Sequence, residues 1–131
     1  MCKIKLLDCT FRDGGYYNLW DFSEKLINNY LFAMKEAKID VVEIGFRSLK
    51  NDGFKGACAF TSDEFLRKLN IYKSLSVSVM VNASELLSND DINTILPKIF
   101  PNDANSSPVD IVRVACHYNE FEKVLNASNW L

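Results

Sequence analysis

The sequence predicts an α/β fold in which parallel strands alternate with crossover helices. Short apolar segments recur along the chain, and segments with helical spacing of apolar residues lie between them. Markers near the strand ends, Leu7, Glu43, Val81 and Ala115, are separated by 36, 38 and 34 residues. This nearly constant spacing predicts about four βα units. An open doubly wound sheet and part of a (β/α)8 barrel both fit, and a whole barrel takes about 250 residues, so about four units are half of one.

The first half of the chain predicts two strands and one helix. Residues 3–7 form a short apolar strand, and the polar, glycine-containing DCTFRDGG that follows is typical of a loop. Asp21 and Glu24 have the spacing of a capping box, which predicts a helix ending near Ala37. Residues 41–46, VVEIGF, are β-branched and apolar, and they predict the second strand.

The second half repeats this order. Thr61 and Glu64 have the spacing of a second capping box, with an apolar helix face continuing to Tyr72. Residues 76–81, SVSVMV, predict a strand whose serines suit either a half-exposed sheet or a barrel interior. The remaining expected elements are a helix within residues 84–100, interrupted or ended by Pro97, a strand at 109–115 and a helix at 118–126.

Composition bounds the functional class. The 131 residues, 48% hydrophobic and 24% charged, predict one globular domain spanning 1–131. The net charge of -2 provides no basic field for nucleic acid. No apolar stretch is long enough to span a membrane, and the N-terminus lacks a signal-peptide pattern, so we expect a cytoplasmic protein. The cysteines are far apart in sequence, and buried, reduced thiols are expected at Cys2, Cys9, Cys58 and Cys116.

The residues that could carry chemistry begin directly after the first strand. In DCTFRDGGYY, Arg12 and Asp13 are adjacent to two glycines. An aspartate here can bind a hard cation, and a guanidinium can bind a carboxylate or a developing enolate oxygen. The alternative is that Arg12 and Asp13 only stabilise the loop through local hydrogen bonds.

Glu43 is a second candidate, because it interrupts the apolar segment VVEIGF. An unpaired carboxylate would cost several kcal/mol to bury there. Arg12, at the carboxyl end of the neighbouring strand, is the expected partner. Pairing of Glu43 with Arg47, or exposure of Glu43 to solvent, remains the alternative.

These residues resemble a known family. LLDCTFRDGGYYNLWDF followed by VVEIGFRS is similar to the start of the DRE-TIM metallolyase superfamily, and most similar to its 4-hydroxy-2-oxovalerate aldolase branch. The resemblance covers residues 4 to 48. It implies a TIM barrel of which this chain is the amino-terminal half. The signature DxTxRDG and the glutamate of the second strand are matched by Asp8, Thr10, Arg12, Asp13, Gly14 and Glu43.

The resemblance also implies a reaction. Its members make or break a carbon–carbon bond next to a carbonyl, here in a 2-oxo acid or related acyl substrate. Asp13 would bind a divalent cation, Mn2+ or Mg2+, and Arg12 would stabilise the enolate. Glu43 would hold Arg12 or the polar end of the substrate.

The sequence departs from the family at two points. Tyr16 stands where the aldolases carry an acid/base histidine, so Tyr16 is the candidate proton relay. The family's HxH metal ligands are missing, since His117 is the single histidine. Asn82 and His117 follow predicted strands and are candidate substrate-binding residues, although both also suit ordinary loops.

Three functional hypotheses follow. The first is a metal-dependent lyase, with the isolated half-barrel expected to be inactive and to form homo-oligomers through its open sheet edges. The second is a catalytically silent half-barrel that binds a ligand or dimerises. The third is an open doubly wound domain of response-regulator or nucleotide-binding type, with Asp8 and Asp13 forming an acidic metal pocket.

Overall fold

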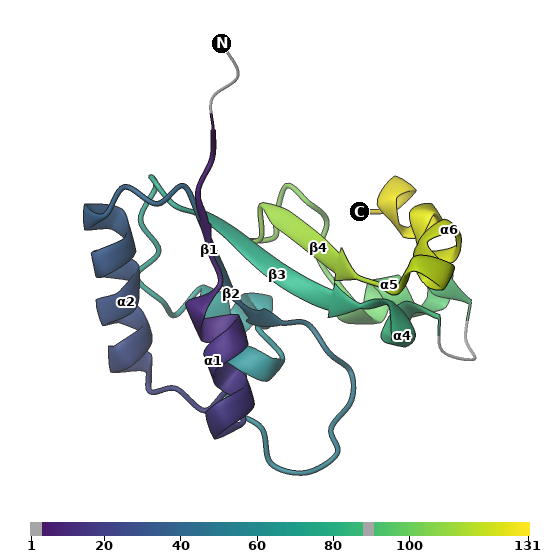
Figure 1. The fold of residues 1–131 in the computed structure, drawn as a ribbon, viewed down its shortest axis with the longest axis horizontal. Coiled ribbons are helices and arrows are strands. Elements are labelled where there is room, and N and C mark those ends of the chain that lie inside the picture. Colours follow the sequence, from purple (N-terminus) through teal and green to yellow (C-terminus); the bar gives the residue numbers. More distant parts are fainter. Residues whose placement is uncertain (1–3, 88–90) are drawn as a thin grey trace.

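A computed structural model describes residues 4–87 and 91–131 as a four-stranded parallel sheet with helices between the strands (Figure 1). The strands are β1 (Leu7–Asp8), β2 (Val41–Phe46), β3 (Ser76–Asn82) and β4 (Ile111–Ala115). The helices are α1 (Thr10–Asn18), α2 (Glu24–Glu36), α3 (Asp63–Leu66), α4 (Ala83–Leu86), α5 (Ile92–Ile99) and α6 (Phe121–Val124). Short 3-10 segments cover Ala57–Ala59, Tyr118–Glu120 and Leu125–Asn129.

The strand order distinguishes the two architectures left open by the sequence. The sheet runs β1-β2-β3-β4, and every neighbouring pair is parallel. Right-handed crossovers between consecutive strands place all the helices on one face, as in a barrel, whereas a doubly wound sheet requires the strand order to reverse. The predicted α/β fold of about four βα units is therefore confirmed, and its topology is that of a barrel fragment.

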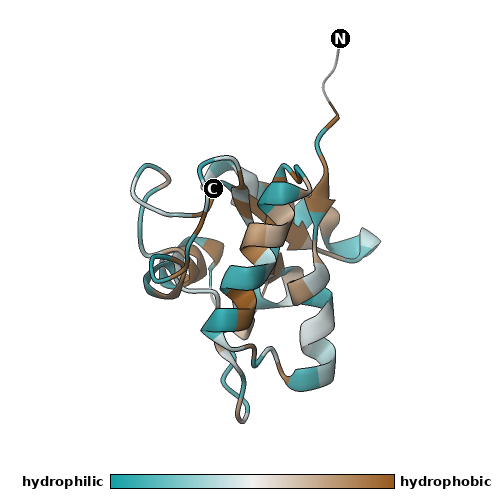
Figure 2. Ribbon diagram, turned by 90° about the vertical axis from the view of Figure 1, so that its left-hand side faces the viewer, coloured by the Kyte–Doolittle hydropathy of each residue, from teal (hydrophilic) through white to brown (hydrophobic). Residues whose placement is uncertain are grey.

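The two faces of the sheet differ in chemistry. On β3, Val77, Val79 and Val81 lie in apolar clusters with helix residues such as Ile27 of α2 and Leu96 of α5. The helices accordingly show alternating hydrophobic and hydrophilic segments (Figure 2). Because side chains alternate along a strand, the residues between these valines face the opposite side. This second face, which we call the inner face, carries the polar side chains described below.

The segment predicted as a loop after the first strand is instead helix α1. The Asp8 carboxylate accepts hydrogen bonds from the Thr10 N–H at 3.0 Å and the Thr10 hydroxyl at 3.1 Å, which supports the first turn. Gly15 provides room for the Trp20 ring, since an added Cβ would lie 1.9 Å from Trp20 Cδ1. The loop prediction was wrong because a glycine required for packing was interpreted as a turn signal.

The helix starts also differ by a small shift. Ser23 caps α2 and Ser62 caps α3, each accepting the N–H three residues further on at 3.2 Å. The predicted caps were the residues Asp21 and Thr61. The Thr61 hydroxyl donates to the carbonyl of Cys58 at 3.0 Å and so does not serve as the cap.

Other boundaries are shorter than predicted. β1 comprises Leu7–Asp8, and the predicted Lys3 lies outside the described residues. The helix expected within 84–100 is divided into α4 and α5, and residues 88–90 are also outside the described part. α3 ends at Leu66, well before Tyr72. The last predicted helix is one turn of α-helix between 3-10 segments.

Two predictions from composition bear on the described residues. Cys9, Cys58 and Cys116 are free thiols, and Cys2 lies outside the described range. Cys58 is buried as expected and Cys9 is half-buried, but Cys116 is exposed where it follows β4, so the prediction of burial is wrong for Cys116. Burial raises the pKa of Cys58 to about 12, so this thiol is inert at neutral pH. Across residues 4–87 and 91–131, no helix has the length and apolar character needed to cross a membrane.

Candidate functional site

The centre of the site is an ion pair between Arg12 of α1 and Glu43 of β2. Arg12 Nε donates to Glu43 Oε1 at 2.6 Å, and the Glu43 side chain is fully buried. This contact is the pairing expected from the sequence. Arg12 also contacts Asp13, its Nη1 lying 2.7 Å from Asp13 Oδ1, so the local contact that the sequence left as an alternative forms as well.

Glu43 receives two further partners from the inner face. Arg113 of β4 donates through Nη1, which lies 3.2 Å from Oε1 and 3.1 Å from Oε2 of Glu43. Ser78 of β3 donates from Oγ to Glu43 Oε2 at 3.3 Å. Both carboxylate oxygens are thus occupied, and Glu43 acts on Arg12 as a positioning residue.

Together these contacts form a continuous series of alternating charge, Asp13, Arg12, Glu43 and Arg113, which we call the charged series. Its interior is enclosed: the Arg12 side chain is 14% exposed and that of Glu43 is 0% exposed. Its ends are open, with Asp13 58% exposed and Arg113 43% exposed. The negative end therefore suits a cation and the positive end suits an anion.

Several contacts hold Arg12 in place. The indole N–H of Trp20 donates to the Arg12 carbonyl at 2.9 Å, and the guanidinium carbon lies 5.9 Å from the centre of the Phe46 ring. Burial alone would lower the pKa of Arg12, but the charges of Glu43 and Asp13 raise it above its ordinary value. The site therefore presents a permanently charged guanidinium in one orientation.

Asp8, the first residue of the family-like signature, has a structural role. Its Oδ1 accepts the Tyr30 hydroxyl at 2.6 Å, in addition to the two contacts with Thr10. Burial alone would raise the pKa of Asp8, but these hydrogen bonds lower it overall. Burial and the contact with Asp8 raise the pKa of Tyr30 strongly. Asp8 thus connects β1 to α1 and α2 and does not form the acidic pocket with Asp13 considered for a doubly wound domain.

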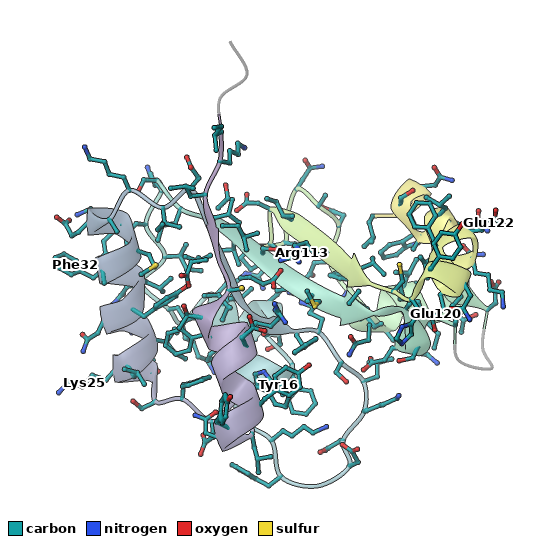
Figure 3. All side chains as sticks on the ribbon, viewed as in Figure 1. Tyr16, Lys25, Phe32, Arg113, Glu120 and Glu122 are labelled. Carbon is teal, nitrogen blue, oxygen red and sulfur yellow. The ribbon has the colours of Figure 1, made fainter. Side chains whose placement is uncertain are left out.

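The remaining predicted residues differ in their distance from the charged series: Tyr16 stands one helical turn after Arg12 and packs on the same Phe46 ring, whereas Asn82 and His117 lie further away. Tyr16 is 63% exposed, and its ring packs edge-on against Trp20 with a centroid distance of 4.8 Å. Asn82 ends β3 and His117 follows β4, and both are exposed. Each stands four residues beyond a member of the inner-face cluster, Ser78 or Arg113, which corresponds to roughly 13 Å along a strand. In Figure 3, Tyr16 projects from α1 and Arg113 from β4.

Asp13 is suited to be one ligand of a hard cation, because its carboxylate is exposed and its Oδ2 accepts the Cys9 thiol at 3.3 Å. A complete ligand set is not present around it. Within the described ranges, no group of three or more His, Cys, Asp or Glu side chains is placed to hold a metal ion. Asp13 accordingly fits one ligand position, and the described residues do not complete the coordination.

The sequence analysis did not select Arg113 or Ser78 as site residues. The signal was available for Arg113, because it is a charged residue within the apolar strand IVRVA, which is the same argument that selected Glu43. Ser78 gave an ambiguous signal, since alternating serines suit either a half-exposed strand or a barrel interior. The structure buries Ser78 completely.

Arg47 belongs to a separate buried cluster. Its Nη2 contacts Asp63 Oδ1, and both side chains are buried. Asn102 and Ser107 also donate to the Asp63 carboxylate, at 2.7 and 3.2 Å. Burial alone would raise the pKa of Asp63, but these partners lower it. Pairing of Arg47 with Glu43, the alternative in the sequence analysis, is therefore wrong.

A groove of about 680 Å3 lies beside β4 and the C-terminal segment. Its apolar lining includes Val112, Val114, Phe121 and Trp130. Among the residues that line it, none belongs to the charged series. The groove and the candidate site are therefore separate features of the described molecule.

Comparison with known proteins gives one informative similarity. No family model and no curated protein matches the sequence. A solved structure from Bacteroides vulgatus, described as "the N-terminal domain of a putative aldolase", superposes with a TM-score of 0.78 at 31% sequence identity. The alignment covers 96% of this chain and 40% of that chain, so the present chain spans less than half of its length. The chain is therefore an aldolase-like α/β domain.

Proposed function

We propose that this domain contributes the enolate-stabilising site of a carbon–carbon lyase, an aldolase that acts on a 2-oxo acid or a related acyl substrate. The observation that carries the proposal is the Arg12 guanidinium, held at 2.6 Å by the buried Glu43 within an aldolase-like domain. Fixed positive charge in an enclosed site is the feature that lowers the barrier to enolate formation. The similar structure supports the aldolase class, and the residues support the assignment of roles.

The chemistry assigned to Arg12 is electrostatic. In retro-aldol cleavage, the hydroxyl of the substrate loses its proton and becomes a carbonyl as the carbon–carbon bond breaks. The electron pair of that bond passes to the 2-oxo fragment as an enolate. We place the enolate oxygen against Arg12, which contacts Glu43 through Nε and Asp13 through Nη1. Glu43 fixes the guanidinium and does not take the proton, since both of its oxygens are occupied.

The other predicted residues complete the proposal. Asp13 would be one ligand of Mn2+ or Mg2+, and such an ion, when bound, polarises carbonyl oxygens. The remaining ligands would come from outside the described residues. Tyr16 is proposed as the proton relay, supported by its exposed position on the same helix as Arg12. Asn82, exposed at the end of β3, and His117, exposed after β4, would contact the distal part of a longer substrate.

Mn2+ titration of the complete enzyme to which this domain would contribute, followed by electron paramagnetic resonance or calorimetry, tests the metal-binding role, because the described residues do not complete the coordination. We expect Asp13→Asn to weaken Mn2+ binding at least about tenfold, which corresponds to about 1.4 kcal/mol. The matched control is Asp52→Asn, which removes an aspartate that is exposed and paired with Lys55. Equal Mn2+ affinity of the Asp13 variant and the control would remove Asp13 from the metal site.

Titration with oxalate, a planar mimic of the enolate of pyruvate, tests the role of Arg12. Arg12→Met is expected to lose oxalate binding. Arg67→Met is the control, because Arg67 is exposed and bonds to the carbonyl of Ser106. Retained oxalate affinity in the Arg12 variant would refute the proposed function.

The open sheet favours a second candidate function, a half-barrel that associates with a second copy of itself without catalysis. Within the described residues, β1 and β4 are the outer strands. β4 of one copy could therefore lie beside β1 of another in the same parallel direction, and a two-fold arrangement would close eight strands. Exposed apolar residues near β1, Ile4 at 82% and Leu6 at 54%, support this proposal. Sedimentation velocity tests it.

A further inference from the structure

The positive end of the charged series has unused hydrogen-bonding capacity. Arg113 uses Nη1 alone for its two contacts with Glu43, at 3.1 and 3.2 Å. Its Nε and Nη2 have no hydrogen-bond partner in the described part of the chain, and 43% of its side chain is exposed. The side-on edge of this guanidinium, with two parallel N–H donors, is therefore open to a ligand.

Glu43 does not require Arg113 for neutralisation. Arg12 already pairs with Glu43 at 2.6 Å, and Ser78 donates to its second oxygen. A buried carboxylate needs one cationic partner, and ordering a second long side chain costs conformational entropy. The contact with Glu43 instead fixes Arg113 in one orientation, as a preorganised binding group requires.

The position of Arg113 on the sheet is consistent with a role towards substrate. Its neighbours on β4, Val112 and Val114, pack against the apolar core between sheet and helices. Arg113 therefore faces the inner side, the same side as Ser78 and Glu43. Arg12, the group proposed to bind the enolate, contacts the same carboxylate at Oε1.

We propose that Arg113 binds the carboxylate of the acid substrate and makes the site selective for acids over neutral carbonyl compounds. The identity of this acid as a 2-oxo acid rests on the proposed function. The open Nε–Nη2 edge matches a carboxylate in bidentate geometry, which an ammonium group does not reproduce. The charged series then has two separate tasks: Arg12 stabilises charge that develops on oxygen, and Arg113 recognises charge that the substrate already carries.

The experiment compares pyruvate with pyruvamide, its neutral analogue, as ligands of the 131-residue chain without added metal. Chemical-shift titration of arginine Nε–Hε signals by NMR measures both affinities. We expect wild type to prefer pyruvate, and Arg113→Met to lose about ten- to a hundredfold in pyruvate affinity, the value of a hydrogen bond to a charged group. Pyruvamide affinity should be almost unchanged. Arg67→Met removes the same charge far from the inner face and should retain the preference.

A second variant protects the test against misfolding. Arg113→Lys keeps the positive charge beside Glu43 but lacks the planar donor edge, so it should fold and still lose most of the selectivity. If Arg113→Lys and Arg113→Met both kept the wild-type preference for pyruvate over pyruvamide, the role of Arg113 would be overturned. If Arg12→Met lost pyruvate binding in the same experiment, the proposed function would still stand. If the Arg113 variants lost the preference for pyruvate while Arg12→Met bound pyruvate as wild type does, the carboxylate site at Arg113 would be supported and the role of Arg12 in enolate stabilisation would be refuted. Absence of pyruvate binding by wild type at millimolar concentration would also overturn the proposal.

Discussion

At the scale of single residues, the site depends on one buried carboxylate shared by two guanidinium groups. Glu43 is fully buried and is satisfied by Arg12, Arg113 and Ser78. Removing its charge would leave Arg12 enclosed without its main partner. The stability of the fold and the geometry of the site are therefore coupled through this residue.

Glu43→Gln is expected to lower the free energy of unfolding by about 3 kcal/mol. This value is at the lower end of the range for a broken buried ion pair, because Arg113 is partly exposed and can be hydrated. Urea denaturation at neutral pH measures the change. Glu64→Gln is the matched control, since Glu64 is 84% exposed in its pair with Lys68 and should have almost no effect. If Glu43→Gln and Glu64→Gln had the same midpoint of urea denaturation, the stability of the fold would not depend on the ion pairs of Glu43.

A pH effect is expected from Asp63. Its partners Arg47, Asn102 and Ser107 hold its pKa in the folded state below the ordinary value of 3.8. The folded state therefore binds fewer protons than the unfolded state, and this stabilisation is present above about pH 4 and is lost as the pH falls through the folded pKa. Asp63→Asn should reduce the loss of stability between about pH 5 and pH 2 in urea denaturation. If the free energy of unfolding fell with decreasing pH as steeply in Asp63→Asn as in wild type, other carboxylates would control acid unfolding.

Contacts between site residues were predictable from the sequence where a charged residue interrupts an apolar strand. That argument gave the pair of Glu43 with Arg12 from sequence, because an unpaired buried carboxylate is too costly. The same argument applies to Arg113 but requires knowing that β4 lies two strands from β2, which a local pattern does not provide. Exposed residues such as Asn82 and His117 lack any such energetic constraint, so their positions follow from the topology alone.

At the scale of elements, the largest discrepancy is the helix that replaces the predicted loop after β1. Arg12 lies in the first turn of helix α1, from which its guanidinium reaches the carboxylate of Glu43 on β2. A glycine pair normally argues against a helix, and here tertiary packing overrides that preference. Strand positions were predicted well because apolar β-branched segments are local signals, whereas helix α1 depends on Trp20, which follows it in the chain.

The two adjacent glycines of α1 give opposite predictions. In Gly14→Ala the new Cβ would lie 3.7 Å from Phe22, an ordinary contact, so the variant should gain up to about 1 kcal/mol of helix stability. In Gly15→Ala the Cβ would lie 1.9 Å from the Trp20 ring, so the variant should lose about 1–3 kcal/mol. Urea denaturation and tryptophan fluorescence measure both. Similar effects of the two substitutions would show that α1 does not pack on Trp20 in solution.

At the scale of the whole molecule, four consecutive parallel strands leave two outer edges in the described residues. The apolar groove beside β4 and the exposed side chains of Ile4 and Leu6 beside β1 lie at these edges. Open edges with apolar neighbours favour pairing with another chain. The strand order β1-β2-β3-β4 therefore favours association of the chain with another copy through its outer strands.

We expect the chain to self-associate at micromolar concentration, with sedimentation velocity showing a species larger than the monomer. Lysine substitutions at Ile4 and Leu6 should weaken this association at least about tenfold, because charges on an edge strand oppose pairing. Leu26→Lys is the matched control, since Leu26 is 49% exposed on α2, which packs on the outer face of the sheet. If the edge variants and the control sediment alike as dimers, association uses another surface. A clean wild-type monomer would refute the half-barrel dimer and leave the lyase proposal, which depends on Arg12 and Asp13, unaffected.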